Sequence, residues 1–576
     1  MWLSFALMIV GGVAEMISIG AVLPFLALLA DPQGAARIPA VAMLLDWSGA
    51  TTSADLLLPA VGLLIAAAIF TAGIRLLLAW FSQKFVLELG HDIGVEIYAR
   101  MLRQPYSLYV QRNTSELISG VEKVQIVVFA VLLPAMQALV AAFLAVFIVA
   151  MLIFIDPANA LLAAAAMGAV YIGVSFATRR ILRRNAHTLA VNQTERIKLI
   201  QEGLGGIRDI LIDQSQAVFQ ESFRKLDYGY RRAQTVNVFV AAAPRFIVEA
   251  SGIVLIALLA LFMSARAGGL IAAIPVIGAL ALGAQRLLPL LQLVYSGWSQ
   301  FVGAGQVLID VMVLLRAPVT RDRPREKSAA VLPYQKEIRI RNVSFRYQGS
   351  DEPALSDIDL VVRRGERIGF LGQTGSGKST LIDLLMGLLE PSEGEISIDG
   401  RPLDEATRAQ WQGQIAHVPQ TIYLSDSSIA SNIAFGEEPG TIDIKRVREA
   451  AKRAQIDSFI VSLPDGYDTE VGERGVRLSG GQRQRIGIAR ALYKNAGVLI
   501  FDEATSALDD ETEAAVMGAL SSVGRDLTIF MIAHRLSTLA GCDRLVRLEQ
   551  GRIAAVGAFA ELVGTSADAP ILSNGN

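Results

Sequence analysis

The stretch Ile368-Gly-Phe-Leu-Gly-Gln-Thr-Gly-Ser-Gly-Lys-Ser-Thr380 decides the fold of the second half of the chain. Its apolar start predicts a buried strand over 368–371, and a helix is expected to follow over Thr380–Leu389. The glycines in between let backbone N–H groups close around phosphates, and the start of the helix adds a positive dipole. We expect these consecutive positions to bind a nucleotide: Gly372, Gln373, Thr374, Gly375, Ser376, Gly377, Lys378, Ser379 and Thr380.

Two residues of this loop, and two carboxylates further along, have distinct predicted roles. Lys378 is expected to reach the β- and γ-phosphates, and the hydroxyl of Ser379 is expected to bind Mg²⁺. A second apolar run, Val498–Asp502, predicts a buried parallel strand. Asp502 is expected beside the Mg²⁺ ion, and Glu503 beside the γ-phosphate, where a base could polarise the attacking water. An isolated Asp-Glu pair is more typical of a solvated turn, so the phosphate-binding loop is what favours the catalytic interpretation.

A second anion-binding sequence follows at Leu478-Ser-Gly-Gly-Gln482. A serine and two glycines precede a helix predicted over 483–493, which is again an arrangement that binds phosphate. One nucleotide does not need two such sites in one domain, so the second site is expected to serve the nucleotide of a second copy of the chain. The residues expected to contact that γ-phosphate are Ser479, Gly480, Gly481 and Gln482.

The order of these motifs resembles the ATP-binding cassette of ABC transporters over residues 337–562. The resemblance implies an α/β P-loop domain that binds ATP and Mg²⁺ and hydrolyses ATP to drive transport. It implies that Tyr347 stacks on adenine, that Gln420 contacts Mg²⁺ or water, and that Asp509 lies near the nucleotide. It also places His534 near the γ-phosphate, so that Gln420 and His534 join Glu503 among the catalytic residues. Taken alone, each of these residues has an ordinary structural interpretation.

The first half of the chain has the composition of a membrane region. The chain of 576 residues is 53% hydrophobic and only 18% charged, a balance that a purely soluble protein of this size rarely has. A helix needs roughly 20 apolar residues to cross a bilayer core. Six runs meet this need and predict a polytopic α-helical membrane domain with six spans, whereas a set of buried soluble helices is the alternative. The runs lie near 3–29, 56–81, 125–153, 158–178, 240–264 and 268–296.

Basic residues are concentrated in two of the segments that join the apolar runs. The segments between the second and third runs and between the fourth and fifth carry most of them, whereas the opposite side has only Arg37 and Arg266. Positive residues stay on the cytoplasmic side, so both termini and the cassette are expected there. Helical spacing over 82–120 and 179–234 predicts membrane helices that continue into the cytosol. Short turns are expected near Ser107–Thr114 and near Asp213–Ala217.

These features divide the sequence into four parts. A membrane domain is predicted over 1–316, a linker over 317–336, a cassette over 337–562 and a disordered tail over 563–576. The totals of 52 Lys and Arg against 54 Asp and Glu leave no basic field to attract nucleic acid. The single cysteine, Cys542, excludes a disulfide framework and a metal site built from cysteines.

The fusion of six spans to a following cassette is similar to the half-transporters of the ABC exporter class. That resemblance implies a homodimer, with a heterodimer as the alternative, and coupling helices at the two cytosolic turns. The segments Glu15–Leu26 and Pro244–Glu249 further resemble flippases of lipid-linked oligosaccharides. This implies an amphiphilic lipid-linked substrate, a location in the bacterial inner membrane and a short external helix over Pro39–Trp47. The rival functions are export of lipids, drugs or other amphiphiles, and an ATP-gated channel or regulatory ATPase that translocates nothing.

Four charged residues, Glu15, Arg75, Glu249 and Arg286, lie inside the predicted spans. Charges at such positions are costly and usually functional. Arginines that face a cavity would suit a pyrophosphate-linked sugar head group, so Arg75 and Arg286 are candidate substrate-binding residues. The structural alternative is an internal ion pair of Glu15 or Glu249 with one of these arginines.

Overall fold

The computed structural model describes residues 2–30, 57–111, 114–155, 157–264, 269–319, 332–502, 510–521, 526–532 and 535–563. The chain divides into two compact units, and each is described by itself. The first contains Met1–Gln104 and Gln111–Val319, and the second contains Pro105–Val110 and Thr320–Asn576. The predicted linker and tail fall mainly outside the described ranges, so these domain boundaries stay predictions. The predicted external helix over Pro39–Trp47 also lies outside them.

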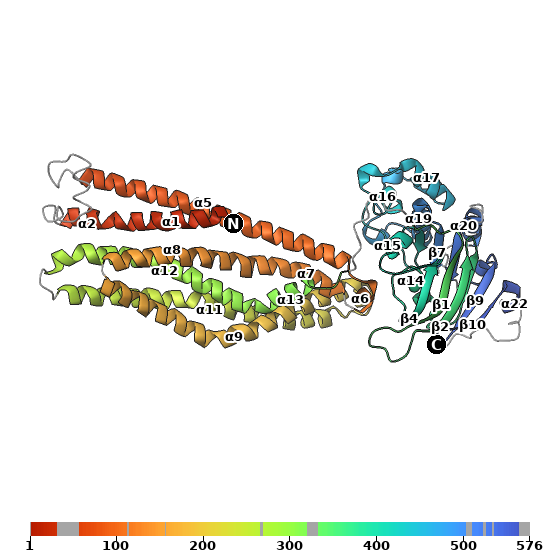
Figure 1. Cartoon of the computed structure of the whole chain (residues 1–576), viewed down its shortest axis with the longest axis horizontal. Helices are drawn as coiled ribbons and strands as arrows, with labels where there is room; N and C mark the ends of the chain where they lie inside the picture. Colours follow the sequence, from red (N-terminus) through yellow and green to blue (C-terminus); the bar gives the residue numbers. More distant parts are fainter. Residues whose placement is uncertain are drawn as a thin grey trace. The chain divides into compact units, whose positions relative to one another are not determined.

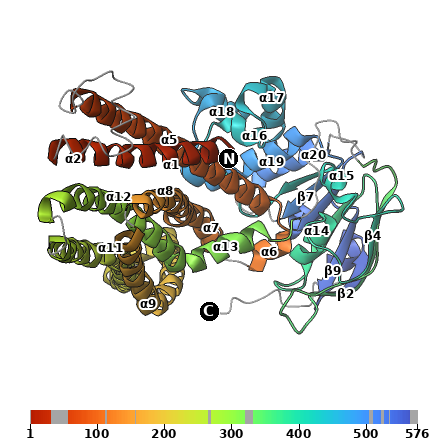
Figure 2. The same ribbon diagram turned by 60° about the vertical axis from the view of Figure 1, so that its left-hand side comes forward.

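The first unit is a bundle of long helices (Figures 1 and 2). Its elements are α1 (Trp2–Gly20), α2 (Val22–Ala30), α5 (Leu57–Leu102), α7 (Thr114–Val127), the π-helical turn η1 (Val128–Leu132), α8 (Leu133–Ile155), α9 (Pro157–Gly205), α10 (Ile207–Ile212), α11 (Gln216–Ser264), α12 (Gly269–Gly303) and α13 (Gly305–Leu315). α12 packs against α8, α9 and α11, and α1 packs against α5 and α8. The core between α1, α8, α11 and α12 buries Ile19, Ile148, Val248 and Leu287. Helices far apart in sequence therefore share one apolar interior.

The six predicted apolar runs all fall on helices, but the predicted number of six membrane spans is not confirmed. Among the described residues, four helices are long and apolar enough to cross a membrane, and a fifth counts if α12 and α13, bent by 60°, form one span. The first run is divided, because α1 ends at Gly20 and α2 begins at Val22. Pro24 accounts for this break, because proline has no backbone N–H to donate to the carbonyl four residues earlier, here that of Gly20.

Three helices extend beyond their apolar runs, as the helical spacing predicts. α5 continues to Leu102 and α9 to Gly205, well beyond the apolar runs, and α11 begins at Gln216, before its own run. The turn predicted near Asp213–Ala217 lies between α10 and α11. The segment predicted as a turn near Ser107–Thr114 is instead the short helix α6 (Tyr106–Gln111). Residues Pro105–Val110 belong to the second compact unit.

Two sheets form the second unit. Their strands are β1 (Glu337–Phe345), β2 (Leu355–Arg363), β3 (Arg367–Leu371), β4 (Glu393–Ile398), β5 (Arg401–Pro402), β6 (Ile415–Val418), β7 (Val498–Asp502), β8 (Thr528–Ile532), β9 (Arg544–Glu549) and β10 (Arg552–Gly557). One sheet has the order β2-β1-β4-β5 and is antiparallel. The other has the order β10-β9-β3-β8-β7-β6, and β3, β6, β7, β8 and β9 run parallel in it. Buried parallel strands are typical of α/β domains, so the predicted cassette fold is confirmed.

Helices accompany the strands of the second unit. They are α14 (Lys378–Leu385), α15 (Arg408–Gln412), α16 (Ile429–Ile433), α17 (Ile444–Arg453), α18 (Asp457–Ser462), α19 (Gly480–Lys494), α20 (Asp510–Ser521), α21 (Leu536–Leu539) and α22 (Phe559–Val563), with single 3₁₀ turns at 439–441, 466–468 and 473–475. The helix predicted over Thr380–Leu389 begins earlier and ends at Leu385, because Gly387 takes a positive φ of 65° that a helix cannot continue. The helix predicted over 483–493 begins at Gly480.

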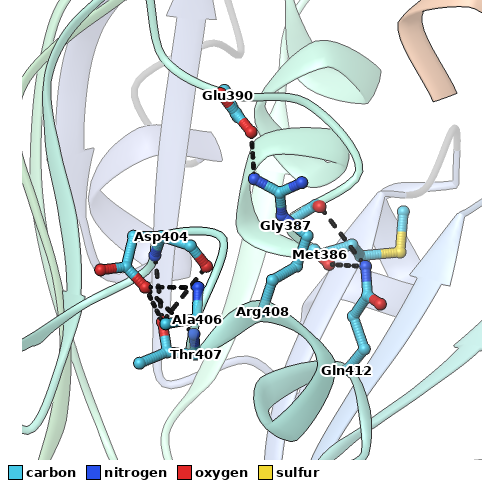
Figure 3. A network of polar contacts seen from close by, with 8 residues as sticks. All are labelled: Met386, Gly387, Glu390, Asp404, Ala406, Thr407, Arg408 and Gln412. Atoms are coloured by element: carbon cyan, nitrogen blue, oxygen red, sulfur yellow. Dashed lines mark hydrogen bonds and ion pairs between the residues drawn. The ribbon is translucent and has the colours of Figure 1, made fainter. Parts of the chain in front are cut away.

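A polar network fixes the end of α14 (Figure 3). Gln412 donates from Nε2 to the carbonyl oxygens of Met386 and Gly387, each at 3.3 Å. Arg408 of the same short helix, α15, forms an ion pair with Glu390. Backbone carbonyls at a helix end lack partners within the helix. The side chains of α15 therefore hold the segment that follows α14, and with it the helix that continues the phosphate-binding loop.

Candidate functional site

The sheet order brings the predicted nucleotide-binding segments to one edge. β3 pairs with β8, β8 pairs with β7, and β7 pairs with β6, all in parallel. Parallel strands place their carboxyl ends at the same edge, where ligands of α/β sheets bind. The phosphate-binding loop follows β3, Asp502 ends β7, and Gln420 comes two residues after β6. Glu503 and His534 follow β7 and β8 in the sequence but lie outside the described residues, as does Asp509.

The loop between β3 and α14 has the backbone that its glycines predict. Gly377 precedes α14 with a φ of 99°, and a Cβ atom there would lie 2.7 Å from Leu355 Cδ2 and 2.9 Å from the Ala354 carbonyl oxygen. Only glycine fits such a position without strain. The ammonium group of Lys378 donates to the carbonyl oxygens of Gly372 and Gln373, at 2.7 and 2.8 Å. The lysine side chain therefore folds back over the loop that the sequence assigns to phosphates.

Tyr347 lies beside the same loop. Its phenol oxygen is 3.1 Å from Oγ1 of Thr380, in the first turn of α14. The ring packs edge-on against Phe345, with 4.9 Å between ring centroids. The aromatic residue predicted to stack on adenine is thus positioned from the antiparallel sheet, whereas the phosphate-binding residues come from the parallel one.

The end of β7 carries negative charge that suits a cation. Burial and, to a smaller extent, the charge of Asp502 raise the pKa of Asp383, on α14, to about 6. Sequence reasoning did not identify Asp383, because nothing in its spacing distinguishes it from a solvent-facing helix residue. The residues predicted to hold Mg²⁺ are Ser379, Gln420 and Asp502, which offer hydroxyl, amide and carboxylate oxygens. Such oxygen donors are the ligands that Mg²⁺ prefers, so the residue types fit the ion.

The second anion-binding sequence forms the start of α19. The Ser479 hydroxyl accepts a hydrogen bond from the backbone N–H of Gln482 at 3.2 Å, and Oε1 of Gln482 accepts one from the backbone N–H of Ser479 at 2.8 Å. This reciprocal cap fixes the helix start, and the N–H groups of Gly480 and Gly481 have no partners within the helix. α19 packs against α16 and α17.

The helices that follow the two anion-binding sequences pack into different hydrophobic cores. Leu381 and Ile382 of α14 belong to the core around Trp411, whereas Ile486 and Ile488 of α19 belong to the core around α16 and α17. Both cores also contain residues of β7 and β8, so α14 and α19 pack against opposite faces of the six-stranded sheet.

One arginine ties α19 to the segment that follows Gln420. Arg490 donates to the carbonyl oxygens of Asn432 and Tyr423, at 2.8 and 2.9 Å, and its guanidinium lies 4.6 Å from the centroid of the Phe435 ring. Burial lowers the pKa of Arg490 to about 10, so the side chain stays charged at pH 7. Arg490 was not predicted from the sequence. The one indication of its role was a long basic side chain on the apolar side of a helix.

A histidine lies in a groove of the second unit. The groove has a volume of about 700 Å³ and is lined by His417, Ile433, Phe435 and Tyr493 among others. Burial lowers the pKa of His417 to about 4. Its Nε2 atom has no hydrogen-bond partner in the described part of the chain. The imidazole is therefore neutral at pH 7.

We expect His417 to lower the stability of the cassette in acid. The unfolded chain binds a proton at this imidazole near pH 6.5, whereas the folded chain does so only near pH 4. Above pH 6.5, His417 is neutral in both states and does not change the free energy of unfolding. As the pH falls from 6.5 toward 4, only the unfolded chain binds the proton, so the free energy of unfolding decreases. Between pH 7.5 and 5, the loss amounts to roughly 2 kcal/mol. Denaturant unfolding of the cassette, followed in the full-length protein, should therefore show a loss of stability between these pH values that is roughly 2 kcal/mol larger in the wild type than in His417→Leu, whereas the raised pKa of Asp383 acts in the opposite direction and equally in both proteins.

The exposed His187 on α9 supplies a matched control for this experiment. His187→Leu should keep the pH dependence of the wild type. If the fall in stability were the same in His417→Leu as in the wild type, the buried imidazole would not be its source.

In the first unit, three of the four charged residues predicted inside the spans form one cluster. Glu15 on α1 is fully buried and pairs with both Arg75 on α5 and Arg286 on α12, the latter at 3.0 Å between Oε2 and Nη1. The ion pair that the sequence left as an alternative is therefore present, and it involves both arginines. Glu249 instead pairs with Arg245 one turn away, at 2.7 Å. Two guanidinium groups share one carboxylate, which leaves the cluster with an excess of one positive charge.

Both arginines of the cluster also line a cavity. The cavity has a volume of about 700 Å³, and its wall combines leucines of α8 and α12 with the polar side chains of Gln83, Gln137 and Gln285. The side chains of Arg75 and Arg286 are 46% and 31% exposed, whereas that of Glu15 is 0% exposed. Among the described residues, none of those that line this cavity is acidic. The positive groups are therefore accessible to an anion, and the carboxylate that balances one of them is not.

Comparison with known proteins gives consistent matches over both halves of the chain. The family model described as "ABC transporter transmembrane region" matches residues 1–268, and the model described as "ABC transporter" matches residues 355–506. A Cupriavidus metallidurans protein named ATP-dependent lipid A-core flippase is 33% identical over 542 residues, which cover 90% of this chain and 86% of the relative. A Pseudomonas aeruginosa protein of the same name is 31% identical over 490 residues, covering 84% of this chain and 79% of the relative.

A solved structure shares the fold of almost the whole chain. It is a bacterial Atm1-family ABC exporter with ATP bound, with a TM-score of 0.77 and 24% sequence identity. The match covers 97% of this chain and 96% of the other.

Proposed function

This chain belongs to the ABC exporters that fuse a transmembrane region to an ATP-binding cassette, and we propose that it moves a lipid with an anionic, sugar-bearing head group. Membership of the family makes it an integral membrane protein that binds ATP and couples ATP hydrolysis to transport. The proposal concerns the cargo. Phosphorylated saccharide lipids include both the lipid-linked oligosaccharides expected from the sequence and the lipid A-core type after which the relatives are named.

The observation that carries this proposal is the cluster of Glu15, Arg75 and Arg286 beside a cavity. Arginine binds phosphate through paired hydrogen bonds, and its charge is worth most where water is scarce. The buried carboxylate orients both guanidinium groups and leaves one positive charge for a ligand. The apolar part of the cavity wall suits a lipid, and the three glutamines suit polar parts of a head group. A cavity for neutral drugs would not need a charge excess that is costly to bury in a membrane protein.

The roles proposed for the nucleotide site follow the sequence and the sheet order. Ser379, Gln420 and Asp502 hold Mg²⁺, which neutralises phosphate charge, and Lys378 binds the β- and γ-phosphates. Glu503 polarises the attacking water, and His534 lies near the γ-phosphate. Two copies of the chain form the transporter, because the start of α19 then completes the nucleotide site of its partner. Support for the dimer comes from the capped start of α19, a second anion-binding arrangement that a single nucleotide in the same domain does not need.

The proposed orientation places the cassette in the cytoplasm and the bundle in the bacterial inner membrane. Cytosolic ATP and the basic residues of the extended helices support it. The helices that leave the membrane then act as levers, and α6 belongs to the compact unit that holds the nucleotide site. Transport would move the lipid head group from the cytoplasmic leaflet to the outer one.

The proposal is tested by the response of ATP hydrolysis to defined lipids in nanodiscs. A polyprenyl diphosphate oligosaccharide and a lipid A-core molecule form the two anionic arms, and an uncharged amphiphilic drug forms the third. We expect at least one anionic lipid to stimulate hydrolysis at about tenfold lower concentration than the drug, because each charge-assisted hydrogen bond contributes about 1.5–3 kcal/mol. The more effective anionic lipid identifies the source of the head group. An equal response to the drug would favour the rival function of a general exporter of amphiphiles.

A further inference from the structure

A second cavity of the bundle lies further along α12 than the cavity that Arg75 and Arg286 line. It has a volume of about 460 Å³ and is formed by α7, η1, α9, α11, α12 and α13. None of the described side chains that line it is charged, but several are amides or hydroxyls. Sites of this size commonly bind small molecules or parts of larger ligands. Its lining includes Asn237, Ser296, Ser299, Gln300 and Gly303.

The polar groups of this cavity retain capacity for further hydrogen bonds. The Oδ1 atom of Asn237 accepts a hydrogen bond from Asn185 at 2.9 Å, so the NH₂ group of Asn237 remains available as a donor. Gln300 donates a hydrogen bond from Nε2 to the Ser296 hydroxyl at 2.9 Å, so the side-chain carbonyl oxygen of Gln300 remains available as an acceptor. Ser299 is 1% exposed, and its hydroxyl has no partner among the described residues. A buried hydroxyl without a partner costs about 1–3 kcal/mol, so the site has a reason to take a ligand that hydrogen-bonds.

One face of α12 connects this cavity with the arginine cavity. Arg286, Pro289 and Leu293 line the first, and Ser296, Gln300 and Gly303 line the second. Their spacing of three, four, three, four and three residues puts all of them on one face of the helix. With a rise of 1.5 Å per residue, Ser296 lies about 15 Å along the axis from Arg286. A ligand whose parts differ in chemistry over that length could occupy both.

We propose that this second cavity binds the uncharged saccharide part of the lipid whose anionic group binds at Arg75 and Arg286. The inference rests on the proposed function and extends it to a second subsite. Vicinal hydroxyls of a sugar donate and accept at once, and they match the mixture of free donors and acceptors on Asn237, Ser296 and Gln300. A charged ligand group would lose its hydration in this cavity and would find no oppositely charged side chain among the described lining residues, which costs much free energy. The lining therefore selects a neutral, polyhydroxylated group.

The test compares lipids that differ only in their sugar. The probes are a polyprenyl diphosphate with and without an uncharged trisaccharide, and lipid A with and without an added uncharged saccharide. In each pair, the member without the added saccharide is called the sugar-free lipid. Dissociation constants are measured for the full-length protein in nanodiscs. We expect at least one pair in which the sugar-bearing lipid binds about tenfold more tightly or better. Ser299→Ala and Gln300→Leu should each reduce that advantage about three- to tenfold, the change expected for one neutral hydrogen bond, and leave the affinity for the sugar-free lipid unchanged.

Two controls separate the subsite from a structural role. Ser299→Ala removes a hydroxyl that has no partner in the described part of the chain, so the melting temperature of the lipid-free protein should not fall. Gln193→Leu removes an amide of α9 that donates to Glu122 at 3.2 Å, away from the residues that line the two cavities. This variant should keep the full advantage of the sugar.

Three results have different consequences. Equal affinities for both members of each lipid pair, or variants that weaken both members alike, would overturn the saccharide subsite and leave the anion site in place. A sugar advantage that persists while Arg286→Gln does not change the affinity for the sugar-free lipid would overturn the proposed anion site alone. If no lipid of either pair binds the wild type, the proposed function fails and the subsite fails with it.

Discussion

Glu503→Gln is expected to lower the rate of ATP hydrolysis by about 10²–10⁴-fold, the contribution typical of a general base. Asp502 ends β7 at the edge of the sheet where the phosphate-binding loop follows β3, and Glu503 is the next residue. The amide keeps the size of the carboxylate but accepts no proton from the attacking water. Hydrolysis is measured as phosphate release from the purified protein, and ATP binding is measured separately with a fluorescent analogue.

The contrast between binding and hydrolysis is what makes this prediction specific. ATP affinity should stay within about threefold of the wild type, since the uncharged amide would not repel the γ-phosphate more than the carboxylate does. The exposed Glu511, at the start of α20, provides a matched control, and Glu511→Gln should keep wild-type hydrolysis. A Glu503→Gln variant that hydrolyses ATP at the wild-type rate would show that another group activates the water.

The second large effect is expected at the intramembrane charge cluster. Arg286→Gln should weaken binding of the anionic lipid about 10- to 100-fold, because it removes a charge-assisted contact worth about 1.5–3 kcal/mol. Glu15 keeps its pair with Arg75 in this variant, so the fold should survive. The measurement is the dissociation constant of the preferred anionic lipid. Arg245→Gln is the matched control, because Arg245 lies in the bundle, pairs with Glu249 and is not one of the described residues that line either cavity.

Variants of the whole cluster separate folding from binding. Removing both arginines leaves Glu15 buried and unpaired, which costs about 3–5 kcal/mol, so Arg75→Gln with Arg286→Gln should be strongly destabilised. Adding Glu15→Gln removes the uncompensated charge and should restore much of the melting temperature without restoring lipid binding. If the triple variant bound the anionic lipid as the wild type does, the cluster would be a purely structural ion-pair network.

The cassette could be predicted closely from sequence because its signals are local. The strand before Gly372, the glycine turn and the helix after it lie within a few residues, and the structure confirms each of them. The predicted helix end at Leu389 was wrong, since Gly387 and the side chains of α15 decide where α14 stops. Asp383 and Arg490 were missed because their properties come from burial against residues that are distant in sequence.

The membrane region was predictable in outline but not in detail. Apolar runs indicate where helices lie, but they do not reveal the break at Ala21 or the bend between α12 and α13. The sequence left open whether Glu15 or Glu249 pairs with the arginines, because that choice depends on how α1, α5 and α12 pack. The second cavity had no sequence signal, since its amides and hydroxyls come from α11 and α12 and are ordinary polar residues when considered one by one.

The central claim, that ATP hydrolysis drives an anionic, sugar-bearing lipid across the bilayer, is tested most directly by a leaflet assay. The protein is reconstituted into liposomes with a labelled polyprenyl diphosphate oligosaccharide or a labelled lipid A-core molecule, and exposure of the label to a membrane-impermeant quencher is followed. The account predicts that at least one of these lipids changes leaflet with ATP in the wild type, and not without ATP or in Glu503→Gln. Movement that is equal with and without ATP, or no movement of either lipid in a preparation that hydrolyses ATP, would contradict it.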